Sequence, residues 1–314
     1  MSLPRLSPNA YRRITFAAAV AVAFIIVTGG AVRLTGSGLG CPDWPTCAGR
    51  RLVGAESFHT AVESINRTIT GLVSVAVILA VLGSLARTPR RRDLIWLSSG
   101  LVAGVVGQIV LGGLTVLFHL WPPLVMSHFL LSMAILAGAV VLHHRAGQVD
   151  GQPTRPVVGD DVRLLGRLVV ANAALAVFLG TVVTGTGPHG GDERVARLPF
   201  FLPDVARLHG ISVMMLLALV LATLWRLRAD GAPDSPMRRG ELLLGVLVAQ
   251  AAVGYVQYFT GVPALLVGVH IAGAAAVWSA AVHFLLGFTA PVSPAPSAPS
   301  SAIVRRRSVL LPNR

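Results

Sequence analysis

Eight long apolar runs limit how this chain can fold more than any other feature of its sequence. About 20 helical residues are needed to cross the roughly 30 Å of hydrocarbon in a bilayer, and each run is long enough. Because unpaired backbone N–H and C=O groups are costly in lipid, we expect every run to be a helix. The sequence therefore predicts an all-α polytopic membrane protein whose eight transmembrane helices lie at about 12–34, 60–86, 94–118, 122–145, 162–186, 204–228, 239–260 and 263–288.

The composition excludes the soluble and disordered classes of protein. Hydrophobic residues make up 54% of the chain and charged residues only 12%, against about 25% in soluble domains. The mean hydropathy is +0.72. The net charge of +13 comes from arginines in short blocks between the apolar runs, a pattern typical of membrane topology. We expect the lipid bilayer to surround the protein, and we expect no nucleic-acid partner.

The arginine blocks also orient the spans. Most arginines lie on one side of the membrane, and by the positive-inside rule this side is cytoplasmic. We therefore expect a multi-pass protein of the cell membrane with both termini in the cytoplasm and long outer loops at 35–59 and 187–203. The Pro/Ser/Ala-rich segment 289–314 is expected to be a disordered cytoplasmic tail. The cytoplasmic arginine blocks lie in the N-terminal segment, in that tail and in the loops 87–93, 145–167 and 226–239.

Two cysteines, Cys41 and Cys47, lie six residues apart in the first outer loop. A pair this close on the oxidising side of a membrane favours a disulfide over two free thiols. We expect one disulfide bond.

The second half of the chain repeats the first. Gln108 lies 20 residues before His128, and Gln250 lies 20 residues before His270. Two halves of four helices each, residues 1–149 and 150–288, would have the same orientation in the membrane. His209 precedes His270 by 61 residues, and the same spacing before His128 falls within one residue of Asn66. The repeat therefore predicts asparagine where one histidine of four would stand.

Three histidines are candidate metal ligands. His128, His209 and His270 each lie about six residues into a span that runs inward, roughly 9 Å below the outer interface. Ionisable residues at such depth favour a functional interpretation. A facing pair, His209 and His270, is typical of bis-histidine haem ligation. The alternative is two histidines that each form a separate hydrogen bond across helices.

The first half offers a second group of polar residues. His59, Glu63 and Asn66 share one face of a predicted helix, beside the expected position of His128. Glu63 is interpreted either as a group for proton transfer or substrate contact, or as the partner of Arg67 or Arg33 in an ion pair. His59 is interpreted as an iron ligand, as an interfacial residue or as a gate residue.

Basic and loop residues complete the candidates. Arginines near the depth of the three histidines suit the propionates of a haem, and these are Arg33, Arg67 and Arg207. Two histidines in outer turns, His119 and His189, are further candidates for propionate contacts. The histidines at cytoplasmic helix ends, His143, His144 and His283, are interpreted as interface residues.

Several motifs together resemble the haem A synthase family. They are GGAVRLTGSGLGCPDWPTCAG at 29–49, ESINRTITG at 63–71, QIVLGGLTV at 108–116 and GTVVTGTGPHGGD at 180–192, with the three histidines above. The resemblance implies an eight-helix protein with two haem sites. It also implies an oxidoreductase that oxidises the C8 methyl group of haem O to a formyl group, which yields haem A for cytochrome c oxidase.

The resemblance also assigns residues. It implies a haem b held by His209 and His270, a substrate haem at His128, Glu63 as the catalytic carboxylate, and a disulfide between the two cysteines. The family commonly has histidine where this chain has Asn66. This departure leaves His128 as the one clear iron ligand at the substrate haem, with His59 as an alternative second ligand and Arg67 beside the site.

The implied partners are a haem O synthase, which would deliver the substrate, and the assembly machinery of cytochrome c oxidase. Two other functions remain open at this point. A di-haem b-type electron-transfer cytochrome explains the histidine pair, and a transporter with parallel repeats explains the two halves.

Overall fold

The computed structural model describes residues 5–41, 43–47 and 54–292. Within these ranges eight helices are long and apolar enough to cross a membrane, which confirms the prediction of a multi-pass, all-α membrane protein. Each expected span corresponds to one helix, with ends that differ by a few residues. The helices are α1 (Pro8–Leu34), α2 (Phe58–Ala86), α3 (Arg92–Leu117), α4 (Pro122–Ala146), α5 (Asp160–Thr186), α6 (Leu202–Ala229), α7 (Asp234–Phe259) and α8 (Ala264–Leu286).

Local sequence signals begin several of these helices. Ser7 caps α1 by accepting a hydrogen bond from the N–H of Ala10, and Ser57 caps α2 in the same way with Thr60. Helices α4 and α6 carry proline in the first turn, where the missing N–H costs no hydrogen bond. The sequence thus fixes the outer starts of α2, α4 and α6, which carry most of the candidate site.

The short outer turns of the two halves have the same structure. Leu120, between α3 and α4, has a φ of 57°, and its N–H donates to the carbonyl of Thr115. Val262, between α7 and α8, has a φ of 59°, and its N–H donates to the carbonyl of Gln257. A residue in the left-handed conformation that forms such a backbone hydrogen bond ends a helix. The next helix therefore starts after a short turn and runs antiparallel, in α3–α4 as in α7–α8.

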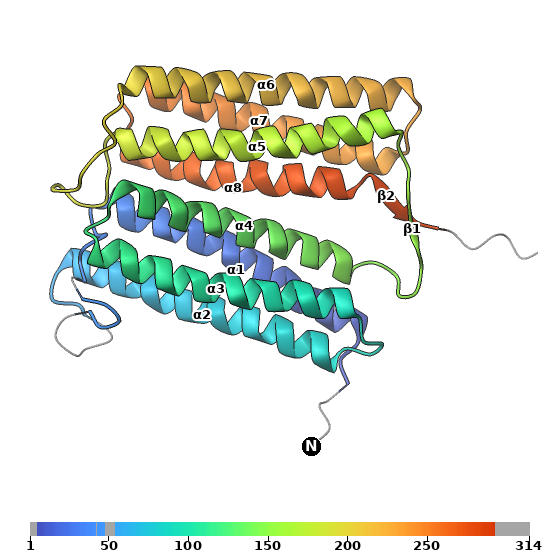
Figure 1. Ribbon diagram of the computed structural model, residues 1–314, viewed down its shortest axis with the longest axis horizontal. Helices are drawn as coiled ribbons and strands as arrows, with labels where there is room; N and C mark the ends of the chain where they lie inside the picture. Colours follow the sequence, from blue (N-terminus) through green and yellow to red (C-terminus); the bar gives the residue numbers. More distant parts are fainter. Residues whose placement is uncertain (1–4, 42, 48–53, 293–314) are drawn as a thin grey trace, which may run out of the picture.

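The helices pack as two sets of four, here called the N-terminal set (α1–α4) and the C-terminal set (α5–α8) (Figure 1). In the first, α1 and α3 each pack against α2 and α4. In the second, α5 and α7 each pack against α6 and α8. Helix α8 also packs against α1 and α4, and α5 packs against α4, so these four helices join the sets. Each set has its own apolar core, around Val77 and Leu136 in one and Val169 and Leu216 in the other.

Two short strands close the end of the helices that the arginine pattern predicts to be cytoplasmic. This end is called the cytoplasmic end below, and the opposite one is called the outer end. Strand β1 (Thr154–Pro156) pairs antiparallel with β2 (Thr289–Pro291), at the end of the helices where α1 begins (Figure 1). The expectation of disorder from residue 289 is therefore wrong at its start. Residues 289–291 find backbone partners in the linker before α5, and the N–H of Val292 also donates to the carbonyl of Pro153. The rest of the expected tail, 293–314, lies outside the described residues.

Candidate functional site

His209 and His270 meet in the middle of the C-terminal set. They lie on α6 and α8, which both pack between α5 and α7 and so stand diagonally across the set. Their ring centroids are 6.3 Å apart and the rings are inclined at 72°. Two imidazoles on opposite sides of one metal ion, with metal–nitrogen bonds of about 2 Å, have centroids about 6 Å apart. The observed spacing therefore fits an axial pair of ligands.

The surroundings of His209 fix its tautomer. Its Nδ1 lies 3.0 Å from the carbonyl oxygen of Ala176 on α5, so Nδ1–H donates and Nε2 is left for a ligand. Metal-binding histidines commonly donate their other ring N–H to a carbonyl in this way. One turn further along α5, Gly180 lies under the ring, and a Cβ there would stand 3.3 Å from the His209 Cε1.

The N-terminal and C-terminal sets hold their α4 and α8 histidines with matching contacts. The side chain of Gln108 donates to the carbonyl of His128 over 2.9 Å, and that of Gln250 donates to the carbonyl of His270 over 2.8 Å. Each ring lies against a glycine of the preceding helix. A Cβ at Gly112 would stand 3.4 Å from the His128 Cε1, and one at Gly254 would stand 3.0 Å from the His270 Cε1.

These two rings also have unpaired nitrogens. Nδ1 of His128 and Nδ1 of His270 are buried and have no hydrogen-bond partner among the residues that the structure describes. Buried polar atoms are nearly always paired in folded proteins. The two rings therefore fit a site that is completed by a bound group, and imidazole is a ligand that iron accepts.

Asn66 stands where the repeat places the fourth histidine. It lies on α2, diagonally across the N-terminal set from α4, and its Oδ1 accepts a hydrogen bond of 2.9 Å from Thr28 of α1. The side chain is half-buried. The position that the repeat matches to His209 thus holds a short amide that is hydrogen-bonded to the neighbouring helix.

His59 contacts the first outer loop. Its Nδ1 is 3.0 Å from the hydroxyl of buried Ser37, and its ring lies against Gly36. The residue itself is exposed. His59 therefore lies beside the first outer loop, and its role as iron ligand, interfacial residue or gate residue stays a prediction.

Glu63 is buried at the outer end of α2, with 5% of its surface exposed. One carboxylate oxygen accepts a hydrogen bond of 2.7 Å from the N–H of Cys41. The other accepts from Arg67, at 2.6 Å from Nη2 and 3.1 Å from Nε. The ion pair between residues four apart on α2 is the one anticipated as an alternative from the sequence, and its partner is Arg67 rather than Arg33.

Arg67 also holds the first outer loop, a role that the sequence did not indicate. Its guanidinium donates to the carbonyls of Cys41, Asp43 and Thr46. The loop is closed by a disulfide between Cys41 and Cys47, both fully buried, which confirms the predicted bond. Glu63 and Arg67 together therefore fasten the disulfide loop to α2.

Arg33 links the N-terminal and C-terminal sets at the outer surface. It lies on α1, and its Nε and Nη2 donate over 2.6 Å to the carbonyls of His189 and Thr184. The ring of His189 in turn lies 2.9 Å from the carbonyl of Val262 in the α7–α8 turn. Arg33 and His189 thus make structural contacts here, whereas Arg207 and His119 are exposed.

The cytoplasmic histidines are less isolated than the sequence suggested. His144 on α4 and His283 on α8 have ring centroids 6.3 Å apart, so they form part of the contact between the two helix sets. Nδ1 of His143 lies 3.2 Å from the hydroxyl of Thr15. No sequence spacing relates α4 to α8 at this end, so only the packing of the sets could bring the two rings together.

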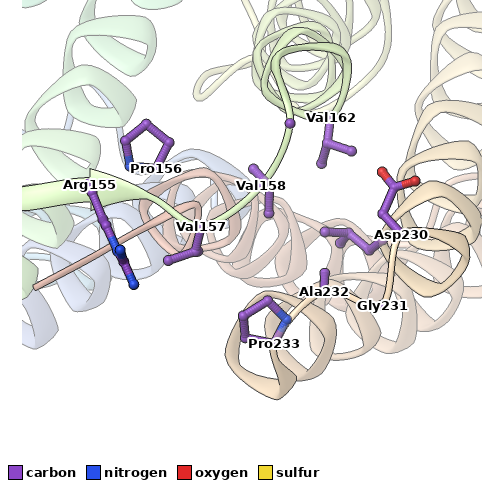
Figure 2. A pocket seen from close by; sticks show the side chains of 11 residues that line it. Arg155, Pro156, Val157, Val158, Val162, Asp230, Gly231, Ala232 and Pro233 are labelled. Carbon is purple, nitrogen blue, oxygen red and sulfur yellow. The ribbon is translucent and has the colours of Figure 1, made fainter. Parts of the chain in front are cut away.

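A separate cavity of about 410 Å³ opens at the cytoplasmic end (Figure 2). Arg155 and Pro156 of the linker, Val162 of α5 and the α6–α7 turn with Asp230 and Pro233 line it. None of the residues expected in the functional site contributes to this lining. The candidate site therefore lies at the other end of the helices.

These features define a helical membrane protein with facing histidines in one set of helices and a single matching histidine in the other. A family model described as cytochrome oxidase assembly protein, COX15-CtaA, matches residues 12–188, more than half of the chain. The chain belongs to this family.

Similar proteins include several haem A synthases. The one from Shouchella clausii is 25% identical over 274 residues, which cover 82% of this chain and 90% of that protein. The one from Caulobacter sp. (strain K31) is 26% identical and covers 86% of this chain and 93% of that protein. The one from Halalkalibacterium halodurans is 24% identical, with coverages of 77% and 85%.

Proposed function

We propose that this protein is a haem A synthase, an oxidoreductase that converts the C8 methyl group of haem O into the formyl group of haem A. The observation that carries the proposal is the contrast between the two helix sets. In the C-terminal set, His209 and His270 face each other. In the N-terminal set, His128 matches His270, but Asn66 stands at the position that matches His209. The names of the similar proteins support the same activity.

His209 and His270 would hold the iron of a haem b. The spacing of the rings, the Nδ1 contact of His209 with Ala176 and the glycines under both rings support this assignment. A bis-histidine haem supplies one-electron transfer. The protein would orient the two rings, exclude water from them and fix the tautomer of His209.

His128 would bind the iron of the substrate haem O. Gly112 allows the His128 ring to lie flat against α3, and Gln108 holds the backbone at that turn. Asn66 is shorter than histidine and is hydrogen-bonded to Thr28, so it would not supply a second imidazole to the substrate haem. His128 would then be the one histidine that holds the substrate.

Glu63 would handle protons as the methyl group is oxidised. The conversion of a methyl to a formyl group replaces two hydrogens with one oxygen and removes four electrons. An external oxidant such as dioxygen must accept these electrons, and a base must accept the protons that are released. Glu63 lies one turn from Asn66 on α2, where Arg67 and the N–H of Cys41 fix its carboxylate. Arg67 would hold that orientation, and the disulfide loop would cover the site from outside.

The arginine distribution supports a cell-membrane protein with cytoplasmic termini, so that the haem sites lie near the outer face. A haem O synthase is the partner that would supply the substrate. The assembly machinery of cytochrome c oxidase would receive the product.

A di-haem electron-transfer cytochrome is the second candidate. The facing pair His209 and His270 favours it as much as it favours the synthase. A symmetric carrier would be expected to keep a histidine at the position of Asn66, and buried Glu63 would have no part in it.

The pigments of the purified protein test the proposal. The full chain is purified from cells that make haem O, and its haems are identified by pyridine haemochrome spectra and chromatography. Haem A together with haem B supports the synthase. Haem B alone, with haem O present in the cells, supports the carrier instead, and the absence of haem contradicts both.

A further inference from the structure

A groove runs along the contact between α3 and α4 in the N-terminal set. It has a volume of about 370 Å³, within the range of about 300–1,000 Å³ that is typical of small-molecule sites. Its lining is apolar and includes three glycines, Gly100, Gly104 and Gly138. At Gly100 an added Cβ would have no atom within 4 Å, so this glycine borders open space in the groove.

One end of the groove lies near His128 along α4. Leu131, which lines its outer part, lies one turn after His128 on α4 and packs against Gly107 of α3. The next contact inward is between Ile135 and Gly104, where an added Cβ would come within 2.7 Å of Ile135. The end of the groove at Leu131 is therefore one turn from the candidate substrate site, and the groove extends from there toward the beginning of α3.

The C-terminal set lacks these glycines. The repeat aligns Gln108 with Gln250 and His128 with His270, and the two pairs make the same hydrogen bond. In this register Gly100, Gly104 and Gly138 correspond to Leu242, Val246 and Ala280. Both sets keep the glycine under the histidine ring, whereas the three glycines that line the groove are replaced by larger residues in the C-terminal set.

We propose that the groove binds the farnesyl tail of haem O, an inference that rests on the proposed function. Haem O differs from haem B by this apolar isoprenoid tail, so only the substrate set needs space for it. Because lipid is itself apolar, moving an apolar tail from lipid into the groove gains little free energy from the hydrophobic effect. Close van der Waals packing of the tail against small residues would supply the attraction instead. The groove would thus distinguish haem O from haem B at the His128 site.

The variant Gly100→Leu tests the groove directly. It places in the N-terminal set the residue that the C-terminal set has as Leu242, at a position where the structure has open space. Gly71→Leu is the matched control, because Gly71 is also exposed on a helix of the N-terminal set, has no atom within 4 Å of an added Cβ and lies outside the groove. Gly100→Ala gives a graded third variant.

The measurement is the affinity of the purified full chain for haem O and for haem B, which are titrated separately. The amount of haem B already bound in the C-terminal set is quantified as a check of folding. We expect Gly100→Leu to weaken haem O binding by about tenfold or more, as a misfitting apolar group does. The haem B affinity of Gly100→Leu should change less than twofold. Gly71→Leu should bind both haems as the wild type does, and the haem O affinity of Gly100→Ala should lie between those of the wild type and Gly100→Leu.

Three outcomes would overturn the groove as the tail site: an unchanged preference for haem O, equal losses for both haems, or a changed oligomeric state with unchanged haem O affinity. The last would indicate a helix-docking surface. A wild-type protein that neither prefers haem O nor forms haem A contradicts the proposed function itself. A wild type that does both, while Gly100→Leu keeps the preference, contradicts only the groove.

Discussion

The carboxylate of Glu63 lies 2.6 Å from Nη2 of Arg67, one turn away on α2, and the same arginine donates to three carbonyls of the disulfide loop. The candidate catalytic acid and the outer loop are therefore parts of one hydrogen-bonded unit. A change at either residue should affect both the chemistry and the loop, and suitable variants separate the two effects.

Replacing Glu63 with glutamine should slow haem A formation by about 10²- to 10⁴-fold, the usual contribution of a general acid or base. The amide is isosteric, so haem binding at His209 and His270 should persist. Haem A yield per bound haem B is the measurement. The control is Glu241→Gln, which removes an exposed carboxylate at the cytoplasmic end of α7. A full rate of haem A formation in Glu63→Gln would rule out a proton-handling role for Glu63.

Replacing Arg67 with alanine should loosen the disulfide loop. Glu63 would lose its charged partner and three carbonyls would lose a donor, at a cost of about 1.5–3 kcal/mol per charged hydrogen bond. We expect a lower unfolding temperature and faster reduction of the Cys41–Cys47 bond. Thiol labelling under mild reductant measures the rate of this reduction. Arg67→Lys keeps the charge and should lose less stability than Arg67→Ala. Labelling of Arg67→Ala at the wild-type rate would contradict the dependence of the loop on Arg67.

Replacing Asn66 with histidine should strengthen binding of the substrate haem, because a second imidazole would stand opposite His128. The expected result is more haem retained per chain after purification. The absorption spectrum of that haem should also become more like that of a haem with two histidine ligands. Asn66→Gln, which keeps the amide, serves as the control. Haem content and spectrum identical to the wild type would show that residue 66 does not face the iron.

Replacing Arg33 with alanine should weaken the outer contact between the N-terminal and C-terminal sets. The two 2.6 Å bonds from Arg33 to the carbonyls of Thr184 and His189 join α1 to the end of α5 and the second outer loop. We expect a lower unfolding temperature with haem B content intact. Arg194→Ala, in the same outer loop and exposed, is the comparison. Equal unfolding temperatures for the two variants would argue against a structural link through Arg33.

The sequence predicts the helices well because their lengths and hydropathy follow from the bilayer itself. The histidine pair was also predictable, since the repeat and the common direction of α6 and α8 put both rings at one depth. The disulfide followed from the loop's side of the membrane. These features depend on spacing along the chain, which the sequence displays.

Other features depend on how distant segments pack. The contact between His144 and His283 arises where α4 meets α8. The carbonyls held by Arg67 depend on the path of an irregular loop, and β2 exists because its residues meet the linker before α5. Hydropathy and local spacing carry no information on any of the three.

The most direct test of the central claim is the mass of the porphyrin after the purified wild-type protein is supplied with haem O and a source of electrons and oxygen. A haem A synthase should yield a product in which one oxygen has replaced two hydrogens, and Glu63→Gln should yield much less of it. Haem O recovered unchanged from a protein that retains its haem B would contradict the claim.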